Sequence, residues 1–227
     1  MTAVSVYLYR TRTVETRERT GLTLETIVDA ALELVDESGF DALSMRKLAA
    51  RCGVGAMTLY GYVRTKDELL GAIADRVFSA LDLPDGDDDL AWEEQVKEVL
   101  RSVRRVFLEH PHLADVIAKQ HTNAIAMYRG AESVLGPMRR AGVSDELAVS
   151  AFIALTTFTT GFAQREAHAE RRSAQTAQRV LAIGSLPAAE FENVVAVAGL
   201  LVTNESEQQF EDGLDFIVRG VGERRQP

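Results

Sequence analysis

The segment from Leu43 to Lys66 combines positive charge with side chains that donate hydrogen bonds. It contains five Lys or Arg residues and no Asp or Glu, whereas the whole chain carries a net charge of −9. Hydroxyl groups are added by Thr58, Tyr60 and Tyr62. Guanidinium, ammonium and hydroxyl groups are donors that proteins direct to the phosphate oxygens of nucleic acid. A basic segment in an acidic protein therefore predicts a local contact with double-stranded DNA.

Two short helices joined by a tight turn are predicted to position these groups. Ser44 caps a helix that runs to Cys52, Gly53 supplies the turn, and a second helix runs from Val54 to Tyr62. In a helix-turn-helix, the first helix lies across the DNA backbone and the second enters the major groove. The alternative is a helical hairpin whose basic face is simply solvated.

The remaining periodic segments also indicate helices. Apolar residues recur at three- and four-residue spacing from Thr23 to Gly39 and again from Thr65 to Pro84. Further helices are expected near 90–109, 112–120, 123–141, 144–170, 187–203 and 206–221. No alternating strand pattern is present. The predicted fold is therefore all-α, with an N-terminal three-helix helix-turn-helix domain and a larger helical domain for ligand binding and dimerisation.

The composition is typical of a soluble globular protein. Hydrophobic residues make up 46% of the chain and charged residues 26%. No stretch approaches the roughly 20 consecutive apolar residues of a membrane span, and Met1 to Arg12 lacks the pattern of a signal peptide. The single cysteine, Cys52, can form neither an internal disulfide nor a cysteine-based zinc site. These features predict a cytoplasmic protein without a cofactor.

Residues 23–70 resemble the DNA-binding domain of the TetR family of transcriptional repressors. The resemblance rests on Leu48-Ala49, on Gly53-Val54 and above all on the run Thr58-Leu59-Tyr60-Gly61-Tyr62-Val63-Arg64-Thr65-Lys66-Asp67-Glu68-Leu69-Leu70. A weaker likeness to the tetracycline-repressor subgroup continues through Trp92, Phe158 to Gly161, and Phe210 to Val221. The chain then divides into a flexible basic arm (1–20), a helix-turn-helix DNA-binding domain (21–68) and a ligand-binding and dimerisation domain (69–227).

The resemblance implies which residues contact DNA. Arg46 matches a position at which an Arg contacts guanine in the subgroup. The predicted DNA-binding residues are Ser44, Arg46, Gly55, Ala56, Met57, Thr58, Tyr60, Tyr62 and Lys66. The base-facing tip, Gly55 to Met57, departs from the subgroup because it offers only close approach and apolar contact, for example to a thymine methyl. The operator is therefore expected to differ from the tetracycline operator.

In the larger domain, the resemblance implies an effector pocket enclosed by helices 90–141. The expected lining residues are Val99, Val103, Ile117, Gln120, His121, Phe158 and Phe162. The tetracycline repressor binds a metal–drug chelate through a His and a nearby Glu, and this chain has Ile117 and Arg165 at the matching positions. We therefore expect an apolar or amphipathic effector that binds without metal.

Two helices of the larger domain have more apolar surface than the core of one chain requires. Helix 144–170 is apolar on several faces, and helix 206–221 carries a continuous apolar stripe. In the family these two helices pack against a second copy as a four-helix bundle, which implies a homodimer. The predicted dimerisation residues are Leu147, Leu155, Phe210, Leu214, Ile217 and Val221. Ordinary core packing is the alternative.

Together these features predict a ligand-responsive repressor that binds a palindromic operator as a homodimer and is released by a small lipophilic molecule. An enzyme is not expected, because a phosphate-binding Gly-rich loop, a nucleophile elbow and an H-E-x-x-H motif are all missing. Glu166 and Glu170 near His168 are interpreted as a solvated helix end, and the pair His110 and His112 as surface residues rather than a metal site. The alternatives left open are an activator and a constitutive architectural DNA-binding protein.

Overall fold

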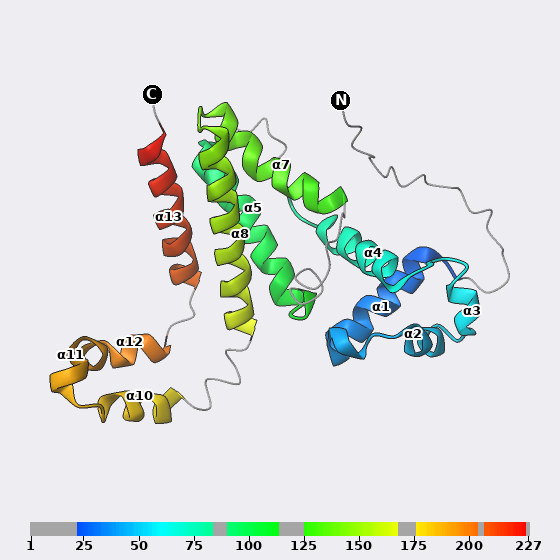
Figure 1. The fold of residues 1–227 in the computed structure, drawn as a ribbon, viewed down its shortest axis with the longest axis horizontal. Coiled ribbons are helices and arrows are strands. Elements are labelled where there is room, and N and C mark those ends of the chain that lie inside the picture. Colours follow the sequence, from blue (N-terminus) through cyan, green and yellow to red (C-terminus); the bar gives the residue numbers. More distant parts are fainter. Residues whose placement is uncertain (1–21, 84–89, 114–124, 168–175, 204–206, 226–227) are drawn as a thin grey trace.

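The computed structural model of this chain describes residues 22–83, 90–113, 125–167, 176–203 and 207–225. In these ranges the regular structure is helical and contains no β-strand, so the predicted all-α fold is confirmed. Figure 1 shows three groups of helices: α1 to α4 on one side, a bundle of α5, α7, α8 and α13, and α10 to α12 set apart from that bundle.

Helix α1 (Leu24–Ser38) begins and ends where its sequence indicates. The Thr23 hydroxyl accepts a hydrogen bond from the Thr26 N–H at 3.1 Å, and the Gly39 N–H donates to the Val35 carbonyl at 2.8 Å. A short 3-10 turn, η1 (Phe40–Ala42), leads to the next helix. The apolar stripe predicted from periodicity is the buried face, formed by Ile27, Val28, Ala31 and Val35.

Helices α2 (Met45–Arg51) and α3 (Ala56–Leu59) form the helix-turn-helix. The Ser44 hydroxyl caps α2 by accepting from the Lys47 N–H at 3.3 Å. Gly53 has a φ of +67°, in the left-handed region that favours glycine, and this makes the turn between the helices. Helix α3 is shorter than predicted because the chain tightens into turns after Leu59, which is fully buried.

Helix α4 (Lys66–Phe78) connects the N-terminal helices to the rest of the protein. Thr65 caps it by accepting from the Glu68 N–H at 3.0 Å, while the Glu68 carboxylate accepts from the Arg64 N–H at 2.7 Å. The Glu68 side chain therefore binds the backbone one residue before the capping residue Thr65. Helix α4 packs against α1 and α7, and Val106 and Ala163 from the larger part join the same core.

The second core lies among α5 (Trp92–Glu109), α7 (Ile125–Arg140), α8 (Asp145–Ala167) and α13 (Glu207–Arg224). Its fully buried members include Val96, Leu100, Met138, Leu155, Phe210 and Leu214. Gly213 permits the close packing of α13 on α8, because a Cβ at this position would lie 2.1 Å from Cζ of Phe158. Any larger residue there would collide with an aromatic ring.

Helices α10 (Thr176–Gly184), α11 (Ala188–Ala196) and α12 (Ala198–Thr203) differ most from expectation. Helix α10 was not predicted, and the helix expected over 187–203 is two helices, with non-helical backbone at Phe191. Apolar side chains such as Leu181 and Leu200 are exposed here. The spacing of apolar residues in this segment therefore does not mark a buried helix face. The helix predicted at 112–120 falls almost entirely outside the described residues.

Candidate DNA interface and effector region

Three basic side chains extend into solvent from the helix-turn-helix. Arg46 and Lys47 lie on α2, and Arg64 lies in the turn before α4; all three are exposed. Within residues 22–83, none of the three takes part in an ion pair. They present positive charge on one small part of an acidic protein, which is the electrostatic requirement for contacting a DNA backbone.

The other two basic residues of the segment contact side chains of their own chain: Arg51 is paired with carboxylates, and Lys66 lies over an aromatic ring with its N–H donors left available. Arg51 donates to the Glu37 carboxylate, with both distances 2.7 Å, and to Glu33 at 2.9 Å. The hydrogen bonds to Glu37 and Glu33 raise the pKa of Arg51, and the bond from Arg51 lowers the pKa of Glu37. The Lys66 ammonium lies 4.5 Å from the centroid of the Phe40 ring. Arg51 therefore holds α2 against α1 rather than offering a free charge.

The predicted hydroxyl donors differ in their availability. Thr58 and Tyr60 are exposed on and just after α3. The Tyr62 hydroxyl instead donates to the carbonyl oxygen of Leu22 at 3.1 Å, and its ring is half-buried. Because this proton is already used, the geometry favours a role for Tyr62 in fixing the start of α1. The Ser44 hydroxyl oxygen already accepts the hydrogen bond that caps α2, but the hydroxyl proton remains able to donate.

The tip of α3 is apolar, as its sequence indicates. Met57 projects with 83% of its surface exposed, and Gly55 is exposed beside it. Ala56 is half-buried against the core of α1 to α4. Of the three predicted base-facing residues, only Met57 and Gly55 therefore face outward.

An aromatic cluster occupies the predicted effector region. Phe158 and Phe162 of α8 lie with Phe210 of α13, with ring centroids 5.4 to 5.7 Å apart. Val103 is half-buried and contacts the same core, whereas Val99 is only 1% exposed and belongs to the packed interior. Three further predicted lining residues, Ile117, Gln120 and His121, lie outside the described residues.

A charged pair beside this cluster was not predicted. Arg104 donates to both oxygens of the Glu166 carboxylate at 2.8 and 2.7 Å, and its guanidinium lies 4.8 Å from the centroid of Phe210. The side chains are 13% and 21% exposed, and the bonds to Glu166 raise the pKa of Arg104. The interpretation of Glu166 as part of a solvated helix end is wrong, because Arg104 reaches it from α5.

Thr159 was also missed. Its side chain is fully buried on α8, and its hydroxyl oxygen forms no hydrogen bond with any described residue. Buried hydroxyl groups are almost always paired, so an unpaired one calls for a physical reason. A threonine within a long apolar helix gives no sequence signal of this kind.

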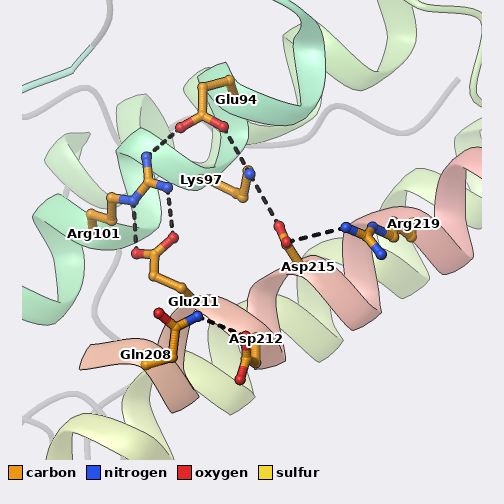
Figure 2. Close-up of polar contacts among 8 residues, drawn as sticks. All are labelled: Glu94, Lys97, Arg101, Gln208, Glu211, Asp212, Asp215 and Arg219. Carbon is orange, nitrogen blue, oxygen red and sulfur yellow. Dashed lines mark hydrogen bonds and ion pairs between the residues drawn. The ribbon is translucent and has the colours of Figure 1, made fainter. Parts of the chain in front are cut away.

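A second charged network joins α5 to α13 (Figure 2). Arg101 pairs with Glu94 and donates to both oxygens of Glu211 at 2.8 and 2.6 Å. Lys97 bridges Glu94 at 2.8 Å and Asp215 at 3.1 Å. The hydrogen bond between Lys97 and Glu94 raises the pKa of the lysine and lowers that of the glutamate. These contacts fix α13 in register along α5.

Most residues predicted at the dimer contact lie inside a single protomer. Leu155, Phe210 and Leu214 are 0% exposed and Val221 is 4% exposed, all within the core of the bundle. The prediction is wrong for these four, because a side chain enclosed by its own chain cannot also pack against a second chain. The remaining two predicted residues, Leu147 and Ile217, are half-buried.

The exposed apolar side chains of the bundle lie on other faces of the same helices. Val149 and Ile153 on α8 are 50% and 58% exposed, and Phe216 on α13 is 75% exposed. Contrary to the expectation that no segment approaches a membrane span, helix α8 is long and apolar enough by length and composition to cross a membrane, with 28% of its most apolar stretch buried. An apolar face of this kind marks a contact with another apolar surface.

A cavity of about 440 Å³ opens to solvent where the start of α8 meets the end of α13. Its lining residues are Gly142, Ser144, Glu146, Leu147, Ser150 and Arg224. None of the described effector-region residues lines this cavity. It is therefore separate from the aromatic cluster.

His110 connects the end of α5 to α1. Its Nδ1 lies 2.8 Å from a carboxylate oxygen of Asp36, and His112 lies against Gly39. Among the described residues there is no group of three or more His, Cys, Asp or Glu side chains that could hold a metal. The two histidines thus contact the N-terminal helices.

Comparisons with known proteins match both parts of the chain to described families. Residues 27–73 match the family described as bacterial regulatory proteins, tetR family, and residues 83–225 match the tetracyclin repressor-like, C-terminal domain. The HTH-type transcriptional repressor DrrR1 of Streptomyces coeruleorubidus is 34% identical over 158 residues, which span 68% of this chain but only 58% of DrrR1.

Solved structures show the same architecture. The TetR family protein ActR of Streptomyces coelicolor, in complex with actinorhodin, is 35% identical, with a TM-score of 0.81 over 91% of this chain and 99% of that chain. A structure of BioQ with its double-stranded DNA operator is 26% identical, with a TM-score of 0.63 over 89% of this chain and 99% of that chain. BioQ of Mycobacterium smegmatis is also among the similar solved structures. The chain therefore belongs to the TetR family, whose members are transcriptional regulators rather than enzymes.

Proposed function

We propose that this protein is a homodimeric repressor that binds a two-fold-symmetric operator and is released from it by a small lipophilic molecule. The observation that carries the proposal is the exposed surface of Arg46, Lys47 and Arg64 on the helix-turn-helix of a chain with a net charge of −9. The operator complex of BioQ and the actinorhodin complex of ActR support it. We place the protein in the cytoplasm, with residues 21–68 as its DNA-binding domain and 69–227 as its ligand-binding and dimerisation domain.

The DNA contacts divide into two kinds. Arg46 is proposed to contact a base, because a guanidinium can bond both acceptors on the major-groove edge of guanine. Thr58, Tyr60 and Lys66 are proposed to contact phosphates, which fixes the orientation of the helices without specifying sequence. Ser44, whose oxygen caps α2, is proposed to add a further phosphate contact by donating its hydroxyl proton.

Substitution of Arg46 and Lys66 should separate these two roles. Arg46→Ala should weaken binding to the preferred operator by about 1–3 kcal/mol and relax the preference at one base pair. Lys66→Ala should weaken binding to all sequences alike and reduce the slope of log affinity against log salt by about one. Fluorescence anisotropy titrations at several salt concentrations measure both effects.

Arg51→Ala is the matched control, because the guanidinium of Arg51 is already bound by Glu33 and Glu37. It should leave the salt dependence unchanged. If Arg46→Ala and Lys66→Ala both bind a selected operator as the wild type does, the assignment of this helix pair to DNA is wrong.

The dimer is proposed to form through the exposed apolar faces of α8 and α13. Val149, Ile153 and Phe216 are left largely exposed by the described residues, and the other sides of both helices are packed against the bundle. In a two-fold dimer the same patch is used by both copies, so one apolar face on each protomer suffices. A second copy would also account for the apolar length of α8 without a membrane.

The effector site is proposed to lie beside the aromatic cluster. Val103, Phe158 and Phe162 supply apolar walls, and the unpaired hydroxyl of Thr159 supplies a polar group. A site with apolar walls and few polar groups selects a lipophilic molecule that carries a hydrogen-bonding oxygen. Ligand-induced movement would reach the DNA-binding helices through α4, which contacts both α7 and α1.

Effector binding should raise thermal stability and release operator DNA together. At a ligand concentration 100 times its Kd, the melting temperature should rise by about 5–10 °C, because binding stabilises the folded state by about 2.7 kcal/mol. Actinorhodin and a panel of lipophilic antibiotics are suitable probes, each tested with and without EDTA. Differential scanning fluorimetry and anisotropy with labelled operator measure the two effects.

Val103→Trp is the variant that tests the site, because the larger ring should fill it and block the response while operator affinity stays nearly unchanged. Release that requires a divalent cation would contradict the metal-free mode. Operator affinity that is indifferent to every probe, in a protein that binds DNA well, would favour the constitutive architectural alternative.

A further inference from the structure

Met57 is the most exposed large apolar side chain among the described residues, at 83%. It lies on α3, two residues after Gly55, on the same helix-turn-helix that carries the exposed charges of Arg46, Lys47 and Arg64. Exposure of this apolar side chain to water does not stabilise the free protein. The positive charge on the same helix-turn-helix selects a polyanionic partner and disfavours an apolar protein surface.

Gly55 has no structural reason to be glycine. Its φ is −74°, a value that any residue adopts, and a Cβ built at this position meets no heavy atom within 4 Å. It is the cap of α3, where Ser, Thr, Asp or Asn would supply a hydrogen bond that is missing here. Gly53, by contrast, needs its positive φ for the turn. Among the described residues there is thus none that occupies the space at Gly55.

We propose that Gly55 lets the major-groove edge of the operator approach the start of α3, and that Met57 packs there on thymine methyl groups. This inference rests on the proposed DNA-binding function and adds the chemistry of base selection. The thymine C5-methyl is the apolar group on the major-groove edge of the four bases. A methionine side chain is flexible and polarisable, so it adapts to such a methyl, and it has no strong hydrogen-bonding group for other base edges. The operator therefore carries thymine opposite α3.

Replacing single thymines by deoxyuridine tests this directly, because only the methyl group is removed. In an operator selected with the wild-type protein, deoxyuridine at the positions facing α3 should weaken binding about fourfold for each methyl lost. Met57→Ala should bind the thymine and deoxyuridine operators equally, since the contact is already absent. Arg46→Ala, which removes a different base contact, should keep the full sensitivity to deoxyuridine.

Gly55→Ser tests the close approach. It should leave the melting temperature unchanged or slightly higher, because serine can cap α3, yet weaken operator binding about tenfold or more. Equal affinity of the wild-type protein for thymine and deoxyuridine operators overturns the methyl contact, and wild-type binding by Gly55→Ser overturns the close approach. Failure to select any duplex DNA would instead overturn the proposed function itself.

Discussion

Replacing Leu214 by Asp should abolish the cooperative folding of the larger part of the protein. Leu214 is 0% exposed among the apolar side chains of α5, α7, α8 and α13. The substitution removes apolar contacts and encloses a carboxylate with no partner, which costs several kcal/mol. This is comparable with the total stability of about 5–15 kcal/mol for a typical domain. Urea titrations followed by circular dichroism measure the loss.

Leu214→Met is the matched control, because it keeps the apolar volume and should cost less than about 1.5 kcal/mol. A Leu214→Asp protein that unfolds with the wild-type midpoint would show that α13 does not pack in this core. The pair also separates core packing from dimer contact, since Leu214 contributes to the former only.

Phe216→Asp should separate the dimer while leaving each protomer folded. Phe216 is 75% exposed and lies two residues from Leu214, so its replacement disturbs no packed interior. A charge placed in an apolar seam between two copies has no partner and strongly disfavours association. Operator affinity should then fall by a factor of about 100 or more, because each protomer binds a single half-site without its linked neighbour. Sedimentation velocity and anisotropy titrations measure the two effects.

Glu223→Ala, an exposed polar position on the same helix, serves as the control and should remain dimeric. The proposal for α8 and α13 fails if the wild-type protein sediments as a monomer at micromolar concentration. It also fails if Phe216→Asp remains a dimer with unchanged operator affinity.

The starts of α1, α2 and α4 could be predicted to the residue because their signals are local. Thr23, Ser44 and Thr65 each cap a helix through a backbone N–H three residues later, and Gly53 makes its turn through its own φ. Such contacts span one helical turn and are fixed by residue type. The tip at Met57 is instead expected from the family resemblance of this segment, and its side chain is exposed.

The dimer face could not be predicted from periodicity alone. A helical repeat identifies an apolar face but does not show whether the covering surface belongs to the same chain. The continuous stripe through Phe210 and Leu214 is covered by its own bundle, and the exposed face is marked by the single residue Phe216 on α13. The prediction that this stripe contacts a second copy is therefore wrong.

The effector region depends on contacts between distant segments. Arg104 and Glu166 are 62 positions apart, and neither stands out in its own helix. That the Thr159 hydroxyl has no partner among the described residues is likewise apparent only from the positions of its neighbours in the structure. Charge and periodicity in the sequence locate helices, but they do not reveal which side chains meet across a bundle.

Selection of bound sequences from a random pool of duplex DNA tests the repressor assignment most directly. The wild-type protein should enrich a palindrome whose half-sites lie about one helical turn apart, roughly 34–36 Å between centres. The same selection with Phe216→Asp should lose the two-fold pattern, because the two recognition helices are no longer held together. A pool that shows no enriched sequence, or one asymmetric site bound equally by wild type and variant, would contradict a dimeric operator-binding repressor.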